Sequence, residues 1–233
     1  MTERAARLRT WAWGWAKSIA IGLAVWLVLS TFLVKAFRIS SGSMERTLLV
    51  GDFLFVNKAL YGAEVPLLGG RLPGVREPRR GDIVVFRSPI EDSILAKRLI
   101  GVPGDTVGMS AGELFRNGRP VSEPYVQHLG SGDPEPPDPG MRRWQLRFFA
   151  GKDSAGYHPT SRDWGPLVVP SDSFFMLGDN RDGSRDGRFW GFVPRRNIQG
   201  SPMIVYFSYD PGHWRPLPFL TAIRWKRLFT RPR

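Results

Sequence analysis

The longest apolar segment of the chain lies close to its N-terminus. Residues 18–34 carry no charge and only three hydroxyl groups. A helix needs about 20 mostly apolar residues to cross the hydrocarbon core of a bilayer. Ala16 and Ala36 complete that length. The pattern therefore predicts one transmembrane helix at residues 16–36.

A cleaved secretory signal and a buried core helix are the two alternatives to a membrane anchor. The apolar region of a signal has about 7–15 residues and ends in small residues at the cut, whereas this run is longer and ends in Val34-Lys35-Ala36-Phe37. A core helix is rarely apolar on every face. Trp11, Trp13 and Trp15 lie where an interfacial aromatic belt is expected. We therefore expect an uncleaved anchor.

The charges before the apolar run predict its orientation. This part of the chain has one acidic residue, Glu3, and four basic ones: Arg4, Arg7, Arg9 and Lys17. Segments rich in Lys and Arg stay in the cytoplasm, while long C-terminal parts are translocated whatever their charge. We expect residues 1–15 in the cytoplasm and residues 37–233 on the outer face of the cytoplasmic membrane.

After the anchor, short apolar runs alternate with turn residues, which is typical of β-structure. The predicted strands are residues 52–56, 82–86, 173–177 and 203–207. Asn117-Gly118 within residues 114–121 favours a tight hairpin. The 26 glycines and 20 prolines disfavour a helical bundle. The fold class expected is mainly β.

One segment interrupts this pattern. Residues 130–140 are dominated by proline, glycine and acids, which predicts neither a helix nor a paired strand. We interpret the segment as an exposed loop within an inserted lobe at about residues 108–168, rather than as a linker between two functional domains.

Composition limits the possible chemistry and partners. The chain has no cysteine, which excludes disulfides, a thiolate nucleophile and a Cys-ligated zinc. Its formal net charge of +12 favours anionic partners. The alternative is that much of this charge is solvated surface. Anionic lipid is favoured over nucleic acid, since no nucleic-acid-binding signature is present.

A serine and a lysine are the candidates for catalysis. A serine hydroxyl is a weak nucleophile until a base takes its proton. The only histidines, His128, His158 and His213, have no motif context. Lys97 lies in the apolar run 94–100, and burial lowers a lysine pKa by penalising the ammonium form. On composition alone, a catalytic role is not the only interpretation. Lys97 could be a strand lysine with a solvated amine, and Ser43 an ordinary turn serine.

Three sequence blocks in this order resemble the type I signal peptidases, membrane-bound serine proteases with a Ser/Lys dyad. They are Ser41-Gly42-Ser43-Met44, the run containing Lys97, and Gly178-Asp179-Asn180-Arg181-Asp182-Gly183-Ser184-Arg185-Asp186. The resemblance extends from about Phe37 to Gly200. It implies an antiparallel β catalytic core with a smaller inserted β lobe, and no cofactor.

The resemblance also implies roles for single residues. Ser43 corresponds to the nucleophile and Lys97 to the general base. Ser41 corresponds to a serine of the oxyanion hole, and Ser184 to one that orients the lysine. Asp186 and Arg188 correspond to residues that brace this loop. Apolar positions that correspond to two shallow substrate pockets, or else serve core packing, are Phe37, Ile39, Met44, Leu48, Leu54, Val85, Leu95 and Ala96.

The chain departs from the family pattern at two positions. Arg46 and Ser40 stand where many members have proline. Proline would stiffen the backbone there, whereas arginine leaves it freer and adds charge beside the site.

Two other segments have alternative interpretations. Asp182-x-Ser184-x-Asp186-Gly187 begins like a calcium loop, but the acid required at its twelfth position is replaced by Val193. We therefore expect no metal. The aromatic and basic segment 222–229 predicts a helix, which either lies on anionic lipid or packs Trp225 and Phe229 onto the core.

Together these features predict a membrane-anchored serine endopeptidase. Its expected partners are preproteins with signal peptides, cut after Ala-x-Ala, and an anionic lipid surface. Two alternatives remain. One is another Ser/Lys peptidase that cleaves itself in the cytosol, against which the anchor argues. The other is a non-catalytic, membrane-tethered basic binding protein.

Overall fold

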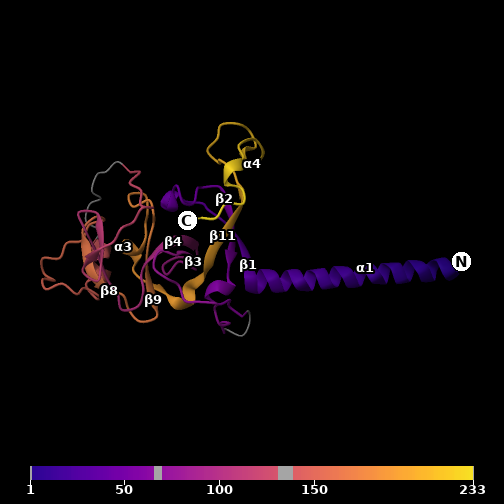
Figure 1. Ribbon diagram of the computed structural model, residues 1–233, viewed down its shortest axis with the longest axis horizontal. Helices are drawn as coiled ribbons and strands as arrows, with labels where there is room; N and C mark the ends of the chain where they lie inside the picture. Colours follow the sequence, from indigo (N-terminus) through magenta and orange to yellow (C-terminus); the bar gives the residue numbers. More distant parts are fainter. Residues whose placement is uncertain (1, 66–69, 131–138, 233) are drawn as a thin grey trace.

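The protein consists of a long N-terminal helix, α1, and a body built on two antiparallel β-sheets, as seen in the computed structural model (Figure 1). The structure describes residues 2–65, 70–130 and 139–232, with the backbone alone for residues 2–8, 10, 28, 29 and 31. The prediction of a mainly β protein with antiparallel sheets is confirmed.

The first sheet brings strands from both ends of the chain together. Among the described residues it has seven strands, in the order β1-β2-β11-β3-β4-β9-β10. They are β1 Val34–Arg38, β2 Asp52–Asn57, β3 Ile83–Arg87, β4 Ile94–Gly101, β9 Ser173–Leu177, β10 Val193–Pro194 and β11 Ile198–Ser208. The four strands predicted from the sequence are confirmed as β2, β3, β9 and part of β11. Because β11 pairs with both β2 and β3, it joins the two halves of the sheet.

The second sheet comes from the stretch between β4 and β9. In the described part of the chain it has four strands, ordered β7-β6-β5-β8. They are β5 Thr106–Ser110, β6 Glu113–Arg116, β7 Arg119–Pro120 and β8 Trp164–Val168. The predicted hairpin is confirmed, since Asn117 and Gly118 have φ values of 53° and 75° between β6 and β7.

The remaining helices are short, and one of them corrects a prediction. They are α2 Pro139–Gln145, α3 Gly187–Trp190 and α4 Pro218–Thr221. The loop predicted at residues 130–140 falls mostly on residues 131–138, outside the described residues. The exclusion of helix was wrong for Pro139 and Gly140, which open α2. Proline in a first helical turn loses no hydrogen bond, because the N–H there has no partner within the helix.

The N-terminal helix differs from its predicted limits. Helix α1 spans Thr2–Val28, a π-helical turn follows at Leu29–Leu33, and β1 begins at Val34. The prediction of helix up to residue 36 was therefore wrong, because Val34 to Ala36 pair with β2. Within the described residues, no helix combines the length and the apolar character that crossing a membrane requires.

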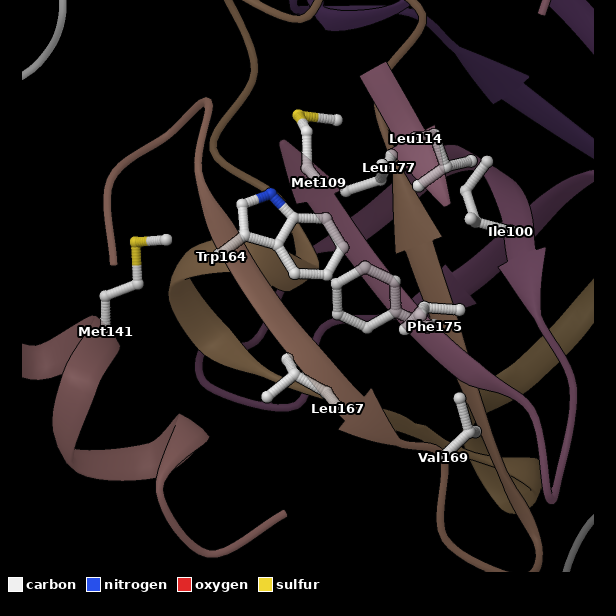
Figure 2. Packing of buried hydrophobic residues seen from close by; sticks show 10 residues of the cluster. Ile100, Met109, Leu114, Met141, Trp164, Leu167, Val169, Phe175 and Leu177 are labelled. Atoms are coloured by element: carbon white, nitrogen blue, oxygen red, sulfur yellow. The ribbon is translucent and has the colours of Figure 1, made fainter. Parts of the chain in front are cut away.

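Two hydrophobic clusters matter for the arrangement of the site. The first joins the sheets (Figure 2), where the Trp164 and Phe175 rings lie 5.1 Å apart. The second lies between β2, β3, β4 and the turn after β1, and contains Ile39, Met44, Leu48, Leu54, Val56, Ile83, Val85, Ala96 and Val205. This second cluster supports the turn that carries Ser43.

The C-terminal segment does not form the predicted helix. Its only helical part among the described residues after α4 is a single 3₁₀ turn at Trp225–Arg227. Trp225 and Phe229 are both 73% exposed, so packing of these aromatics onto the core was wrong. Backbone hydrogen bonds from Val205 to Thr230 and from Phe229 to Val205 hold the segment against β11 instead.

Candidate active site

Ser43 lies in a 3₁₀ turn, Gly42–Met44, between β1 and β2. The residue is 6% exposed, and its Oγ lies 3.3 Å from Ser41 Oγ. Its carbonyl oxygen accepts a hydrogen bond of 3.1 Å from the Asn180 N–H. The Ser43 turn is thus attached to a segment that is distant in the sequence.

Lys97 lies on β4, the strand that contacts the Ser43 turn. The residue is 3% exposed, and its Nζ donates a hydrogen bond of 3.0 Å to Ser184 Oγ. Burial lowers the pKa of Lys97 to about 8, an effect that Asp186 opposes by its negative charge and Arg188 reinforces. A substantial fraction of this amine is therefore neutral near pH 8 and free to accept a proton.

Gly178 brings Ser184 next to the Ser43 turn. A Cβ placed on Gly178 would lie 2.2 Å from Ser184 Oγ and 2.6 Å from the Ser43 carbonyl oxygen. These separations are below any normal contact distance, so only glycine fits. Gly178 consequently lies between the Ser43 backbone and the Ser184 hydroxyl, to which Lys97 Nζ donates.

Asp186 and Arg188 hold the loop that carries Ser184. The Asp186 carboxylate accepts hydrogen bonds from the N–H groups of Gly178 and Arg188, and pairs with the Arg188 guanidinium at 2.9 Å. Burial by itself would raise the pKa of Asp186, but Arg188 and Lys97 bring it below its ordinary value. Arg188 also donates to the carbonyl oxygens of Arg181 and Ser184. This pair therefore fixes both sides of the loop.

A second buried ion pair was not assigned a role from the sequence. Arg98 and Asp179 are joined by two hydrogen bonds of 2.8 and 2.6 Å, and Asp179 also accepts from Thr47 Oγ1 at 2.7 Å. Asn180 Nδ2 donates to the Gly42 carbonyl. Two sequence features could have pointed to these residues. Arg98 directly follows Lys97, and Asp179 and Asn180 belong to the third block.

A small cavity of about 20 Å³ opens beside Ser43. Its lining includes five of the predicted pocket residues, namely Phe37, Ile39, Met44, Leu95 and Ala96. The other three, Leu48, Leu54 and Val85, do not line it. They are at most 1% exposed and form the core beneath it. A space of this size holds about one water molecule or methyl group.

The backbone conformation at Arg46 accounts for the absence of proline there. Its φ is 68°, in the left-handed region. Proline is restricted to φ near −65°, so it could not occupy this backbone. Arg46 therefore does more than loosen the turn, because the backbone conformation itself is one that proline cannot adopt.

The residues that suggested a calcium loop have other partners. Asp182 contacts His128 Nδ1 at 3.0 Å and accepts from the Gly130 N–H. In the described ranges, no group of three or more histidines, aspartates or glutamates is arranged to hold a metal ion. Asp182 therefore holds His128 at the edge of this loop.

The sequence is similar to that of known proteins along most of its length. Residues 12–207 match the family described as signal peptidase, peptidase S26. The chain is 38% identical to a signal peptidase I of Pseudomonas aeruginosa over 226 residues, which is 90% of this chain and 77% of the relative. It is 35% identical to one of Leptolyngbya laminosa over 202 residues, covering 83% and 79% of the two chains. A crystal structure of a signal peptidase I from Enterococcus faecalis has 31% sequence identity, covers 55% of this chain and 98% of its own, and gives a TM-score of 0.37.

Gly178→Ala is expected to destabilise the protein, because the new Cβ would collide with Ser184 and with backbone at Ser43. Overpacking of this kind costs about 1–3 kcal/mol. Urea unfolding followed by tryptophan fluorescence measures the change in the free energy of unfolding. Gly70→Ala is the control, since its Cβ would meet no atom of the described residues within 4 Å. Equal stability of the two variants would contradict the close approach at Gly178.

Proposed function

The chain belongs to the signal peptidase I family, peptidase S26, and from this we propose that it removes signal peptides from exported preproteins by a Ser/Lys mechanism. Members of this family are serine endopeptidases, so the protein is an enzyme. The observation that carries the proposed mechanism is the buried Lys97 amine, whose pKa is about 8 and which lies with Ser184 beside the Ser43 turn.

The proposed reaction begins with proton transfer from Ser43 to Lys97. Neutral Lys97 Nζ accepts the hydroxyl proton as Ser43 Oγ bonds to the scissile carbonyl carbon. The C–N bond then breaks, and the Lys97 ammonium returns the proton to the departing amine of the mature protein. Water next attacks the Ser43 ester and gives one proton to Lys97. The bond between the acyl carbon and Ser43 Oγ then breaks, Lys97 returns the proton to Ser43 Oγ, and the signal peptide leaves as a carboxylic acid that ionises in water.

Ser41 and Ser184 have supporting roles in this proposal. The Ser43 N–H and the Ser41 hydroxyl would stabilise the oxygen that gains negative charge in the tetrahedral intermediate. The position of Ser41 Oγ, 3.3 Å from Ser43 Oγ, is compatible with that role. Ser184 orients the Lys97 amine through its hydrogen bond of 3.0 Å.

The cavity beside Ser43 supports a preference for small substrate side chains. Its volume of about 20 Å³ has room for a methyl group but not for a large side chain. We propose cleavage after Ala-x-Ala, with Phe37, Leu95 and Ala96 among the residues that would contact substrate alanine. Leu48, Leu54 and Val85 would act on specificity only indirectly, by supporting this lining.

Helix α1 supports membrane attachment. Its described apolar side chains are solvent-exposed, including Ile19 at 56%, Leu23 at 60% and Trp26 at 64%. Figure 1 shows the helix extending away from the body, so the body does not cover these side chains. We propose that residues 18–33, which continue α1 through the π-helical turn, anchor the chain in the cytoplasmic membrane, with residues 1–15 inside and the β-sheets outside.

Purified protein is expected to cut a preprotein after an Ala-x-Ala sequence, and Ser43→Ala is expected to lose this activity by several orders of magnitude. Gel electrophoresis and mass spectrometry of the products give the rate and the cut site. Ser171→Ala is the control, because Ser171 is exposed in the turn before β9. Cleavage by Ser43→Ala at the wild-type rate would exclude Ser43 as the nucleophile.

The pH dependence of kcat/KM is expected to report Lys97. Activity should rise along an acid limb with its midpoint near pH 8, and should be lost below it as the ammonium re-forms. Lys97→Arg should be inactive at every accessible pH, since a guanidinium stays protonated. Lys152→Arg, at an exposed position, should keep the wild-type profile. An active Lys97→Arg variant with the same limb would mean that another group is the base.

Protease added to spheroplasts is expected to degrade the β-sheet body and to leave an N-terminal fragment ending near residue 36. The fragment is protected because the anchor and residues 1–15 lie in and behind the membrane. Immunoblotting with an N-terminal tag detects it. Lysed spheroplasts provide the control. A body that stays intact until lysis would reverse the proposed topology.

A further inference from the structure

The C-terminal segment reaches back to the turn that carries Ser43. After α4, the Arg224 N–H donates to the Ser208 carbonyl and the Phe229 N–H to the Val205 carbonyl, so the chain runs beside β11. Figure 1 shows this yellow segment ending next to β2 and β11. The 3₁₀ turn Trp225–Arg227 therefore lies at the start of β2, close to residues 47–52.

Arg227 is the residue of this turn that faces inward. Its Nε donates to Asp52 Oδ1 at 3.0 Å, and its Nη2 donates to Asp52 Oδ2 and, at 3.1 Å, to the Thr47 carbonyl. The Asp52 carboxylate is fully buried and also accepts from the Leu49 N–H and the Ser208 hydroxyl. The Arg227 guanidinium thus connects Thr47 and Asp52, the two ends of residues 47–52.

Thr47 is held from its other side by the site itself. Its hydroxyl donates to Asp179, which is paired with Arg98 beside Lys97. The backbone N–H groups of Thr47 and Leu48 donate to the Met44 carbonyl, directly after Ser43. The position of the Ser43 turn consequently depends on Thr47, and the position of Thr47 depends on Arg227 and Asp179 together.

We propose that Arg227 is a positioning residue for Ser43, acting through Asp52 and the Thr47 carbonyl. This inference rests on the proposed function, because it concerns the same nucleophile. Arg227 contacts neither Ser43 nor the cavity lining in this structure, so it acts on the rate and not on substrate binding. A small displacement of a reacting group can lower a rate by about 100-fold.

The test measures kcat and KM of Arg227→Met on a preprotein, at a temperature where circular dichroism shows the variant as folded as the wild type. We expect kcat to fall by about 10- to 100-fold with KM unchanged. Arg227→Lys keeps a cation opposite Asp52 but lacks the planar fork that reaches both Asp52 and Thr47. Arg227→Lys should have the melting temperature of the wild type but only part of its kcat. If Arg227→Met does not fold, Arg227→Lys is used for the test.

Lys226→Met is the matched control, because it removes one charge from the same turn at an exposed position. It should retain wild-type kcat and KM. A folded Arg227→Met or Arg227→Lys that turns over at the wild-type rate overturns the inference, as does a loss explained wholly by unfolded protein. Failure of the proposed function would look different, since the wild type itself would then not cut the preprotein.

Discussion

Burial of one lysine amine is the constraint on which the organisation of this protein depends. An ammonium group loses hydration when it is buried, so the pKa of Lys97 falls to about 8 and its neutral form becomes accessible. A buried amine also needs hydrogen-bonding partners, and Ser184 provides one. Ser184 is on a loop, however, and that loop must itself be fixed. The Asp186–Arg188 pair and the tight fit at Gly178 fix it.

Buried arginines organise the surroundings of this lysine. Arg98, Arg181 and Arg188 are each at most 5% exposed, and each pairs with a carboxylate: Asp179, Glu123 and Asp186 respectively. Removing one partner of a buried pair is costly, because it leaves a charge without compensation. Each of these three pairs is neutral in total, so the net charge of +12 comes from other residues of the chain.

Local sequence patterns were sufficient for much of the fold. The apolar runs predicted β2, β3 and β9, and Asn117-Gly118 predicted the β6–β7 hairpin, because side-chain alternation and turn residues act over a few positions. They did not locate the end of α1, since an apolar run has the same composition in a helix and in the strand that follows. They also predicted a C-terminal helix where the tail is held by its arginines instead.

The sequence by itself determined the candidate chemistry: Ser43, Lys97 and Ser184 stand in blocks that resemble one family, and an uncharged run precedes them. Only the tertiary structure decided how these residues are held. Arg98, Asp179, Thr47, Asp52 and Arg227 form contacts across as many as 180 positions of the chain. Such contacts have no local signature, because they depend on which strands the sheet places side by side. The same pairing separated Phe37, Leu95 and Ala96, which line the cavity, from Leu48, Leu54 and Val85, which support it.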